Sequence, residues 1–319
     1  MNSEKQQLIL DALTRLEGNL QTIRNLVVNQ EISKPQTKST PPKPKKQPKL
    51  QIAQSLPASE LGPIPDYNDL DWPEAVNQHL IIDEDQDDVK KEFRAVQIIG
   101  LMGVPTKDCR ILDCGCGDGY VAKELANNAA EVVGYDINIS QTWNKFSKPN
   151  LRFTSNKENL GDKFDFIVIY DVLDHLEGEN PKEFLTWVSK LLKPNGRIFL
   201  RCHPWTSRHG GHLYTKINKA YLHLALTTDE LTKLGFKLTP NLKINRPLAT
   251  YDMIISKAGL SIESRKGFND VVEPYFSKTL LDRIIKINWA GEIDHSTAIK
   301  IMSSQYIDYY LTKIGRAHV

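Results

Sequence analysis

Cysteine is scarce in this sequence, and long apolar runs are absent. The four cysteines among its 319 residues stand at positions 109, 114, 116 and 202, and no two of them form a Cys-x-x-Cys pair. So few unpaired thiols are typical of a protein kept in a reducing compartment, and we expect a cytoplasmic location. The sequence shows no signal peptide and no run of about 18 apolar residues, so no membrane-spanning helix is predicted.

Two common phosphate-binding signatures are also missing. The most glycine-rich turn has glycines at positions 115, 117 and 119. A dinucleotide-binding fingerprint needs glycine at its first, third and sixth positions, and Tyr120 occupies the sixth. No Gly-Lys-Ser or Gly-Lys-Thr appears either, which excludes a Walker-type site for a phosphate and magnesium.

The same turn is the strongest positive signal in the chain. An apolar run ends at Leu112, Asp113 and the three glycines follow, and a helical pattern begins at Val121. This order predicts a strand, a tight turn and a helix. Glycine at every second position lets the backbone turn sharply and lets a ligand approach the free N–H groups at a helix start, so a nucleotide-like ligand is expected.

Two further apolar runs are placed as in a parallel sheet. The first, 131–135, alternates and leads into Asp136, 17 positions after Gly119. A neighbouring strand would present this carboxylate to a ribose diol. The second run, 164–170, is almost continuously apolar up to Asp171, which suits a strand buried on both faces.

Four segments therefore follow one another in a characteristic order: Leu112-Asp-x-Gly-x-Gly-x-Gly119, the acidic strand end at Asp136, Asp171-Val-Leu-Asp-His-Leu176, and Leu191-Leu-Lys-Pro-Asn-Gly-Arg-Ile-Phe-Leu200. This order resembles the class I S-adenosylmethionine-dependent methyltransferases, from about Cys109 to Lys313. The resemblance implies an α/β fold, a Rossmann-like seven-stranded sheet that is mostly parallel, with an antiparallel last strand and helices on both faces. It also implies S-adenosylmethionine as the cofactor.

The resemblance assigns the cofactor contacts to the ends of the strands. The turn that begins at Asp113 would face the methionine moiety, and Asp136 would bind the ribose hydroxyls. Asn156 stands where the family often has an aspartate that contacts the adenine amino group, and its side-chain oxygen can serve the same purpose. The full predicted cofactor set is Asp113, Gly115, Cys116, Gly117, Gly119, Asp136, Ile137, Asn156, Tyr170 and Asp171.

The passage after the predicted fifth strand, 203–214, is rich in histidine. Reacting groups collect beyond the carboxyl ends of parallel strands, so this passage is predicted to face the methyl acceptor. Methyl transfer to oxygen or nitrogen needs a place for the departing proton, and histidine titrates near neutrality. His203 is the first candidate base, with His209 and His212 behind it, and hydrogen bonding to loop backbone is their alternative role. No metal is predicted, because no nearby carboxylate or cysteine completes an obvious ligand set.

The acceptor is expected to be a small molecule, a nucleotide or a nucleic-acid end. His175 matches a position that is usually histidine in the small-molecule branch of the family. The sequence lacks the Asn/Asp-Pro-Pro-Tyr/Phe motif of amino-directed DNA methyltransferases, and it has no Pro-Cys pair for attack on a pyrimidine ring. The alternative function is a non-catalytic assembly or virion-type scaffold that retains the fold.

The first 56 residues have a different character from the rest. Residues 1–30 carry apolar side chains at heptad a/d spacing across 9–27, which predicts a coiled-coil helix and a homo-oligomer. A single amphipathic helix docked on its own domain is the alternative. Residues 31–56 contain five prolines and six lysines and are predicted to form a flexible linker. These lysines predict either a weak, salt-sensitive contact with nucleic acid or a solubilising spacer.

Residues 57–313 form the predicted methyltransferase domain, and a helix is expected before its first strand, through Val89, Phe93, Val96 and Ile99. The last six residues need a separate explanation. Ile314-Gly-Arg-Ala-His-Val319 is what a common sequencing adapter encodes in this frame. We expect that the reading frame ran into adapter, so that 314–319 is an artefact.

Overall fold

The computed structural model of this protein describes residues 58–68, 72–76, 88–103, 106–176, 180–236, 248–269, 272 and 276–314. The predicted coiled coil at 1–30 and the predicted linker at 31–56 lie outside the described residues. The predicted artefact at 314–319 does so too, apart from Ile314. Within the described part, no helix combines the length and the apolar character needed to cross a membrane.

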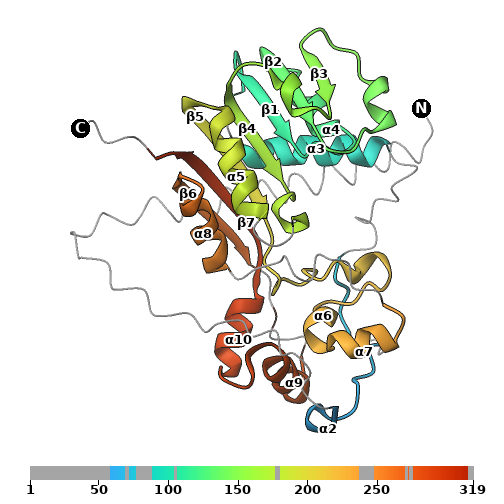
Figure 1. Ribbon diagram of the computed structural model, residues 1–319. Coiled ribbons are helices and arrows are strands. Elements are labelled where there is room, and N and C mark those ends of the chain that lie inside the picture. Colours follow the sequence, from blue (N-terminus) through green and yellow to red (C-terminus); the bar gives the residue numbers. More distant parts are fainter. Residues whose placement is uncertain are drawn as a thin grey trace, which may run out of the picture. The chain divides into compact units, whose positions relative to one another are not determined.

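A seven-stranded sheet forms the centre of the described domain (Figure 1). Its strands are β1 (Arg110–Cys114), β2 (Glu131–Tyr135), β3 (Leu151–Thr154), β4 (Phe164–Tyr170), β5 (Leu192–Cys202), β6 (Leu260–Asn269) and β7 (Ser304–Lys313). They follow the order β3-β2-β1-β4-β5-β7-β6, and β7 runs antiparallel to both of its neighbours while the other pairs are parallel. The predicted sheet, including its antiparallel last strand, is confirmed.

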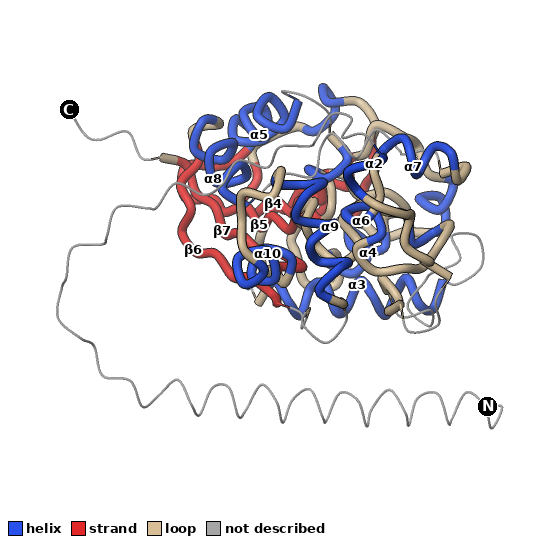
Figure 2. The backbone as a smooth tube through the Cα atoms, turned by 90° about the horizontal axis from the view of Figure 1, so that it is seen from below, coloured by secondary structure: helices blue, strands red, loops and turns tan. Residues whose placement is uncertain are grey.

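Helices cover both faces of this sheet (Figure 2). They are α3 (Asp88–Met102) and α4 (Tyr120–Leu125) on one face, and α5 (Asn180–Leu191) and α8 (Leu248–Lys257) on the other. Successive side chains of a strand point to opposite faces. Ile111 therefore packs in the core of α3 and α4, and Leu112 packs in the core of α5 and α8.

A third hydrophobic core, which with its helices we call the helical lobe, is built from segments far apart in the sequence. Its helices are α2 (Ala58–Leu61), α6 (Leu222–Ala225), α7 (Thr228–Lys233), α9 (Lys278–Trp289) and α10 (His295–Met302). Trp72 is buried in it and donates its Nε1–H to the carbonyl of Ala220 at 2.8 Å. Arg283 donates to the carbonyl of Leu61 at 2.8 Å. The described residues before α3 thus pack in the same lobe as described residues that follow β5 and β6.

Candidate active site

The turn between β1 and α4 has the backbone that its glycines predict. Gly115, Gly117 and Gly119 have φ angles of 86°, 49° and 85°, in the left-handed region that suits glycine. A Cβ atom on Gly115 would lie 2.3 Å from Cγ2 of Val172. One on Gly119 would lie 2.6 Å from the ring of Phe153. At Gly117 no described atom lies within 4 Å of the same position, so the backbone there is open to a ligand.

Asp136 follows β2 and reaches back to this turn. Its Oδ2 accepts a hydrogen bond from the N–H of Gly117 at 3.0 Å, and its Oδ1 accepts one from the N–H of Asn138 at 2.9 Å. The carboxylate thus lies one strand away from β1, where the predicted ribose contact requires it. The next side chain, Ile137, is 76% exposed and leaves an apolar surface beside the carboxylate.

Two stacked aromatic rings close one side of the turn. Trp143, in the 3-10 helix η2 (Gln141–Lys145), lies parallel to Phe153 with 5.2 Å between the ring centroids, and its Nε1–H donates to the carbonyl of Gly117 at 2.8 Å. Asn156 is exposed, and its Oδ1 accepts the N–H of Glu158 at 3.0 Å. The oxygen predicted to contact adenine therefore already caps η3 (Lys157–Leu160), and one of its lone pairs remains for a ligand.

Asp113 lies in the buried part of β1 beneath the turn and is only 3% exposed. Its Oδ2 has no hydrogen-bond partner among the described residues. Burial raises the pKa of Asp113 to about 7, and a backbone hydrogen bond from Ala122 acts in the opposite direction. A buried carboxyl without a full set of donors favours its neutral form.

This raised pKa has a consequence for stability. The ordinary pKa of the group is 3.8, so from about pH 4 to about pH 7 the folded state holds a proton that the unfolded chain has lost. The stability that this proton contributes is present below about pH 4 and is lost as the pH rises through about 7. Asparagine carries no charge at any pH. We therefore expect the unfolding free energy of Asp113→Asn to be higher than that of the unchanged protein by on the order of 3 kcal/mol at about pH 8, and by less at about pH 5. Urea unfolding of both proteins at each pH measures this, and equal differences at the two pH values would contradict it.

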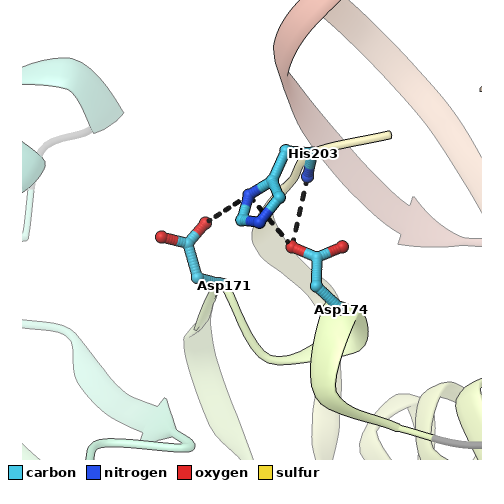
Figure 3. Close-up of side chains that lie close together, drawn as sticks. All are labelled: Asp171, Asp174 and His203. Carbon is cyan, nitrogen blue, oxygen red and sulfur yellow. Dashed lines mark hydrogen bonds and ion pairs between the residues drawn. The ribbon is translucent and has the colours of Figure 1, made fainter. Parts of the chain in front are cut away.

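Two carboxylates and an imidazole converge at the neighbouring strand ends (Figure 3). Asp171 follows β4, Asp174 lies in η4 (Leu173–His175), and His203 follows β5. Nδ1 of His203 lies 3.2 Å from Oδ2 of Asp174 and 3.6 Å from Oδ1 of Asp171. Asp174 is fully buried and His203 is 4% exposed. We call these three residues the Asp–His cluster.

The charges of the Asp–His cluster depend on one another. Burial alone would lower the pKa of His203, but the negative charges of Asp174 and Asp171 outweigh it and raise the pKa to about 9. Burial raises the pKa of Asp174 to about 6, against the effect of His203. Burial also opposes ionisation of Asp171, but His203 and Arg94 hold its pKa below the ordinary value. Without another cation, His203 is therefore protonated near neutral pH and has no lone pair to accept a proton.

The other predicted histidines lie against this cluster. Nε2 of His212 is 2.7 Å from Nε2 of His203, and the ring of His209 is 5.1 Å from that of His203. Burial lowers the pKa of His209 well below its usual value and lowers that of His212 to about 3, and the charge of His203 adds to both effects. The structure thus brings His203, His209 and His212 together and keeps the latter two neutral.

Residues that the sequence reasoning missed complete the surroundings. Arg94 of α3 approaches Asp171, with 3.6 Å between Nη2 and Oδ2. Arg201 of β5 is paired with Asp308 of β7 at 2.6 Å, and its guanidinium lies 5.2 Å from the ring centroid of Tyr306. The Tyr306 ring in turn lies 5.8 Å from that of His203. No local motif marks these residues, because their partners are far away in the sequence.

The Asp–His cluster is a group that can hold a metal ion. One ligand atom from each residue lies within 4.8 Å of the others. Separations of 3.2 and 3.6 Å are those expected between ligands of one cation with bonds of about 2.1 Å. Among the described residues, Nδ1 of His203 and Oδ1 of Asp171 have no hydrogen-bond partner. The argument from sequence against a metal relied on the lack of a nearby carboxylate, and that premise is wrong because the fold supplies two.

Comparison with known proteins shows the family to which the chain belongs. A family model described as a methyltransferase domain matches residues 74–233. The chain belongs to the S-adenosylmethionine-dependent methyltransferases. This membership confirms the resemblance seen in the glycine turn and in the motifs that follow it.

Relatives and solved structures share different parts of the methyltransferase. A ubiquinone biosynthesis O-methyltransferase of Rhizobium etli is 31% identical over 196 residues, which are 58% of this chain and 72% of the relative. One of Dechloromonas aromatica is 28% identical over 101 residues, so the match spans 28% of this chain and 43% of the relative. The solved structure of a methyltransferase from Archaeoglobus fulgidus has 18% identity and a TM-score of 0.46, over 70% of this chain and 94% of that one.

The predicted cofactor residues of the methyltransferase gather at one edge of the sheet. Cys116 belongs to the glycine turn, and burial raises the pKa of its thiol, so it stays protonated and is a poor metal ligand. Tyr170 is the last residue of β4, and the guanidinium of Arg201 lies over its ring, 5.4 Å from the ring centroid. The contacts of these residues with the cofactor stay a prediction.

Proposed function

We propose that this methyltransferase transfers a methyl group from S-adenosylmethionine to a hydroxyl oxygen of a small molecule. The observation that carries the proposal is that the open backbone at Gly117 and the Asp–His cluster occupy the same edge of the sheet. Val172, which follows Asp171 directly, packs so closely on Gly115 that the two regions adjoin. The two relatives described above are O-methyltransferases, which supports the choice of oxygen.

The chemistry sets what the Asp–His cluster has to do. The acceptor oxygen forms a bond with the methyl carbon while the bond from that carbon to sulfur breaks, and the hydroxyl loses its proton. Negative charge therefore develops on the oxygen. With His203 protonated, the cluster carries one positive and two negative charges, which disfavours an oxyanion beside it. We propose that a divalent cation occupies the cluster, because such an ion lowers the pKa of a hydroxyl that it binds. His209 and His212 remain the proposed path of the proton. Because their pKa values are lowered, the proton does not stay on either ring, and we propose that they pass it on to solvent.

Removal of divalent cations is expected to reduce methyl transfer at least about 10-fold, because the acceptor hydroxyl loses the charge that favours its ionisation. The measurement compares protein dialysed against EDTA with the same protein resupplied with Mg²⁺, Mn²⁺ or Zn²⁺. Recovery with one of these ions supports the proposal. Full activity after chelation would mean that the cluster acts as an ion-paired histidine without a metal.

The acceptor class is tested with methyl-labelled cofactor and a panel of hydroxylated small molecules, beside fractionated cell extract with and without nuclease. We expect label in small molecules, insensitive to nuclease. Label in a nuclease-sensitive fraction would replace the small-molecule acceptor by a nucleic acid. Binding of S-adenosylhomocysteine without transfer to any acceptor would favour the scaffold alternative.

A further inference from the structure

Tyr251 lies in α8, outside the motifs and the histidine-rich passage from which the site was predicted, yet its hydroxyl contacts the Asp–His cluster. The hydroxyl donates to Oδ1 of Asp174 at 2.8 Å and lies 3.3 Å from the carbonyl oxygen of His203. The side chain is 1% exposed. It contacts one carboxylate of the cluster and the backbone of the imidazole, but it is not itself one of the three converging ligand groups.

The two carboxylate oxygens of Asp174 have different hydrogen-bond partners. Oδ2 accepts the backbone N–H of His203 at 3.2 Å and faces Nδ1 of the same residue, while Oδ1 points away from that ring (Figure 3). Oδ1 instead accepts the hydroxyl of Tyr251. Asp174 sits in η4, a single 3-10 turn, so its own secondary structure does not fix the carboxylate plane. The tyrosine hydroxyl supplies the second point that prevents this plane from rotating.

We infer that Tyr251 is a positioning residue, which holds the Asp174 carboxylate so that Oδ2 faces Nδ1 of His203. The effect of Tyr251 on the rate of methyl transfer rests on the proposed function, whereas its effect on the surroundings of the His203 ring does not. Without the hydroxyl, Oδ1 would be a buried acceptor with no other hydrogen-bond donor among the described residues, and the carboxylate would rotate. Loss of a group that hydrogen-bonds to a metal-ligating side chain and orients it typically lowers activity by about 10-fold to 100-fold.

The test compares Tyr251→Phe with Tyr309→Phe. Tyr309 is an equally buried tyrosine in the same hydrophobic core, and its hydroxyl donates to Oδ1 of Asp252 at 2.9 Å, on α8 but outside the cluster. Both changes remove one buried hydroxyl and keep the ring. Any loss that reflects packing or stability alone should therefore appear in both variants.

The first readout needs no acceptor. In chelator-treated protein labelled with ¹⁵N-histidine, the ring signals of His203, assigned by their loss in His203→Asn, should shift in Tyr251→Phe and stay in place in Tyr309→Phe. His203 signals that are unchanged by Tyr251→Phe would overturn the inference, as would equal shifts in both variants.

The second readout uses 3,4-dihydroxybenzoate as the hydroxylated probe. We expect Tyr251→Phe to lower kcat by about 10-fold or more with an unchanged KM and unchanged affinity for S-adenosylhomocysteine, and Tyr309→Phe to keep the natural kcat. A natural protein that fails to methylate this probe or any other counts against the proposed function alone, because the His203 spectrum still decides the role of Tyr251. A shifted spectrum with an unchanged kcat would overturn the link to turnover.

Discussion

Asp136→Ala is expected to weaken binding of S-adenosylhomocysteine by about 100-fold, the largest effect on binding that follows from the predicted ribose contact. Hydrogen bonds from two sugar hydroxyls to a carboxylate contribute about 1.5 to 3 kcal/mol each, and alanine removes both acceptors. Asp136 also accepts the N–H of Gly117 at 3.0 Å, so its loss loosens the turn as well. Isothermal titration of both proteins with S-adenosylhomocysteine measures the change.

Asp118→Ala is the matched control for this prediction. Asp118 belongs to the same turn, but its carboxylate is directed to Lys91 at 2.7 Å and to the hydroxyl of Ser140 at 2.9 Å. Its removal should lower stability slightly and leave the affinity within a few-fold of the natural value. If Asp136→Ala binds as tightly as the control, the cofactor does not use this carboxylate, and the enzymatic interpretation of the turn loses its main support.

Asp174→Asn is expected to lower methyl transfer by about 100-fold while the affinity for S-adenosylhomocysteine stays the same. Asp174 presents two acceptor oxygens to the N–H of His203 and the hydroxyl of Tyr251. Asparagine has one acceptor, and its NH₂ group would face one of these donors. The substitution also removes half of the carboxylate charge available to a cation in the Asp–His cluster. Initial rates with labelled cofactor, at saturating acceptor, measure the loss.

Asp252→Asn provides the comparison for Asp174→Asn. Asp252 lies on α8 and accepts the hydroxyl of Tyr309 at 2.9 Å, so the substitution likewise alters a carboxylate that receives a tyrosine hydroxyl. It lies outside the cluster and should leave turnover unchanged. Near-natural activity of Asp174→Asn would show that the cluster does not activate the acceptor, whatever its effect on stability.

Helix α3 shows what the apolar periodicity of a sequence can predict and what it cannot. The apolar spacing predicted a helix before the first strand, and α3 spans Asp88–Met102. However, three of the four side chains that carried the pattern are exposed, by 72% for Val89, 45% for Phe93 and 51% for Val96. The fourth, Ile99, is half-buried and packs against the core. The buried face consists of Ala95, Ile98 and Met102, and the last two pack in one core with residues of α4 and β1. A period of 3.6 residues identifies a helix, but contacts with the neighbouring elements decide which face is buried.

The histidine-rich passage 203–214 shows the same difference between what the sequence predicts and what the tertiary contacts decide. Its position after β5 and its histidines were evident from the sequence, and the fold does bring His203, His209 and His212 together. The partners that set their charge were not evident. Asp174 was part of a quoted motif without an assigned role, and Tyr251 lies 48 residues beyond His203. Burial then lowers the pKa of His209 and His212, while two carboxylates raise that of His203.

The sequence by itself determined the glycine turn, the acidic residue after β2, the order of the strands along the chain and the family. These features are encoded between near neighbours, since left-handed glycines, strand periodicity and helix starts depend on short segments. Only the tertiary structure decided that Asp171, Asp174 and His203 meet, that Tyr251 orients one of them, and that Arg201 pairs with Asp308 across 107 residues. Such contacts arise when separate strand ends and helices are packed together, and burial then sets the charge of each group.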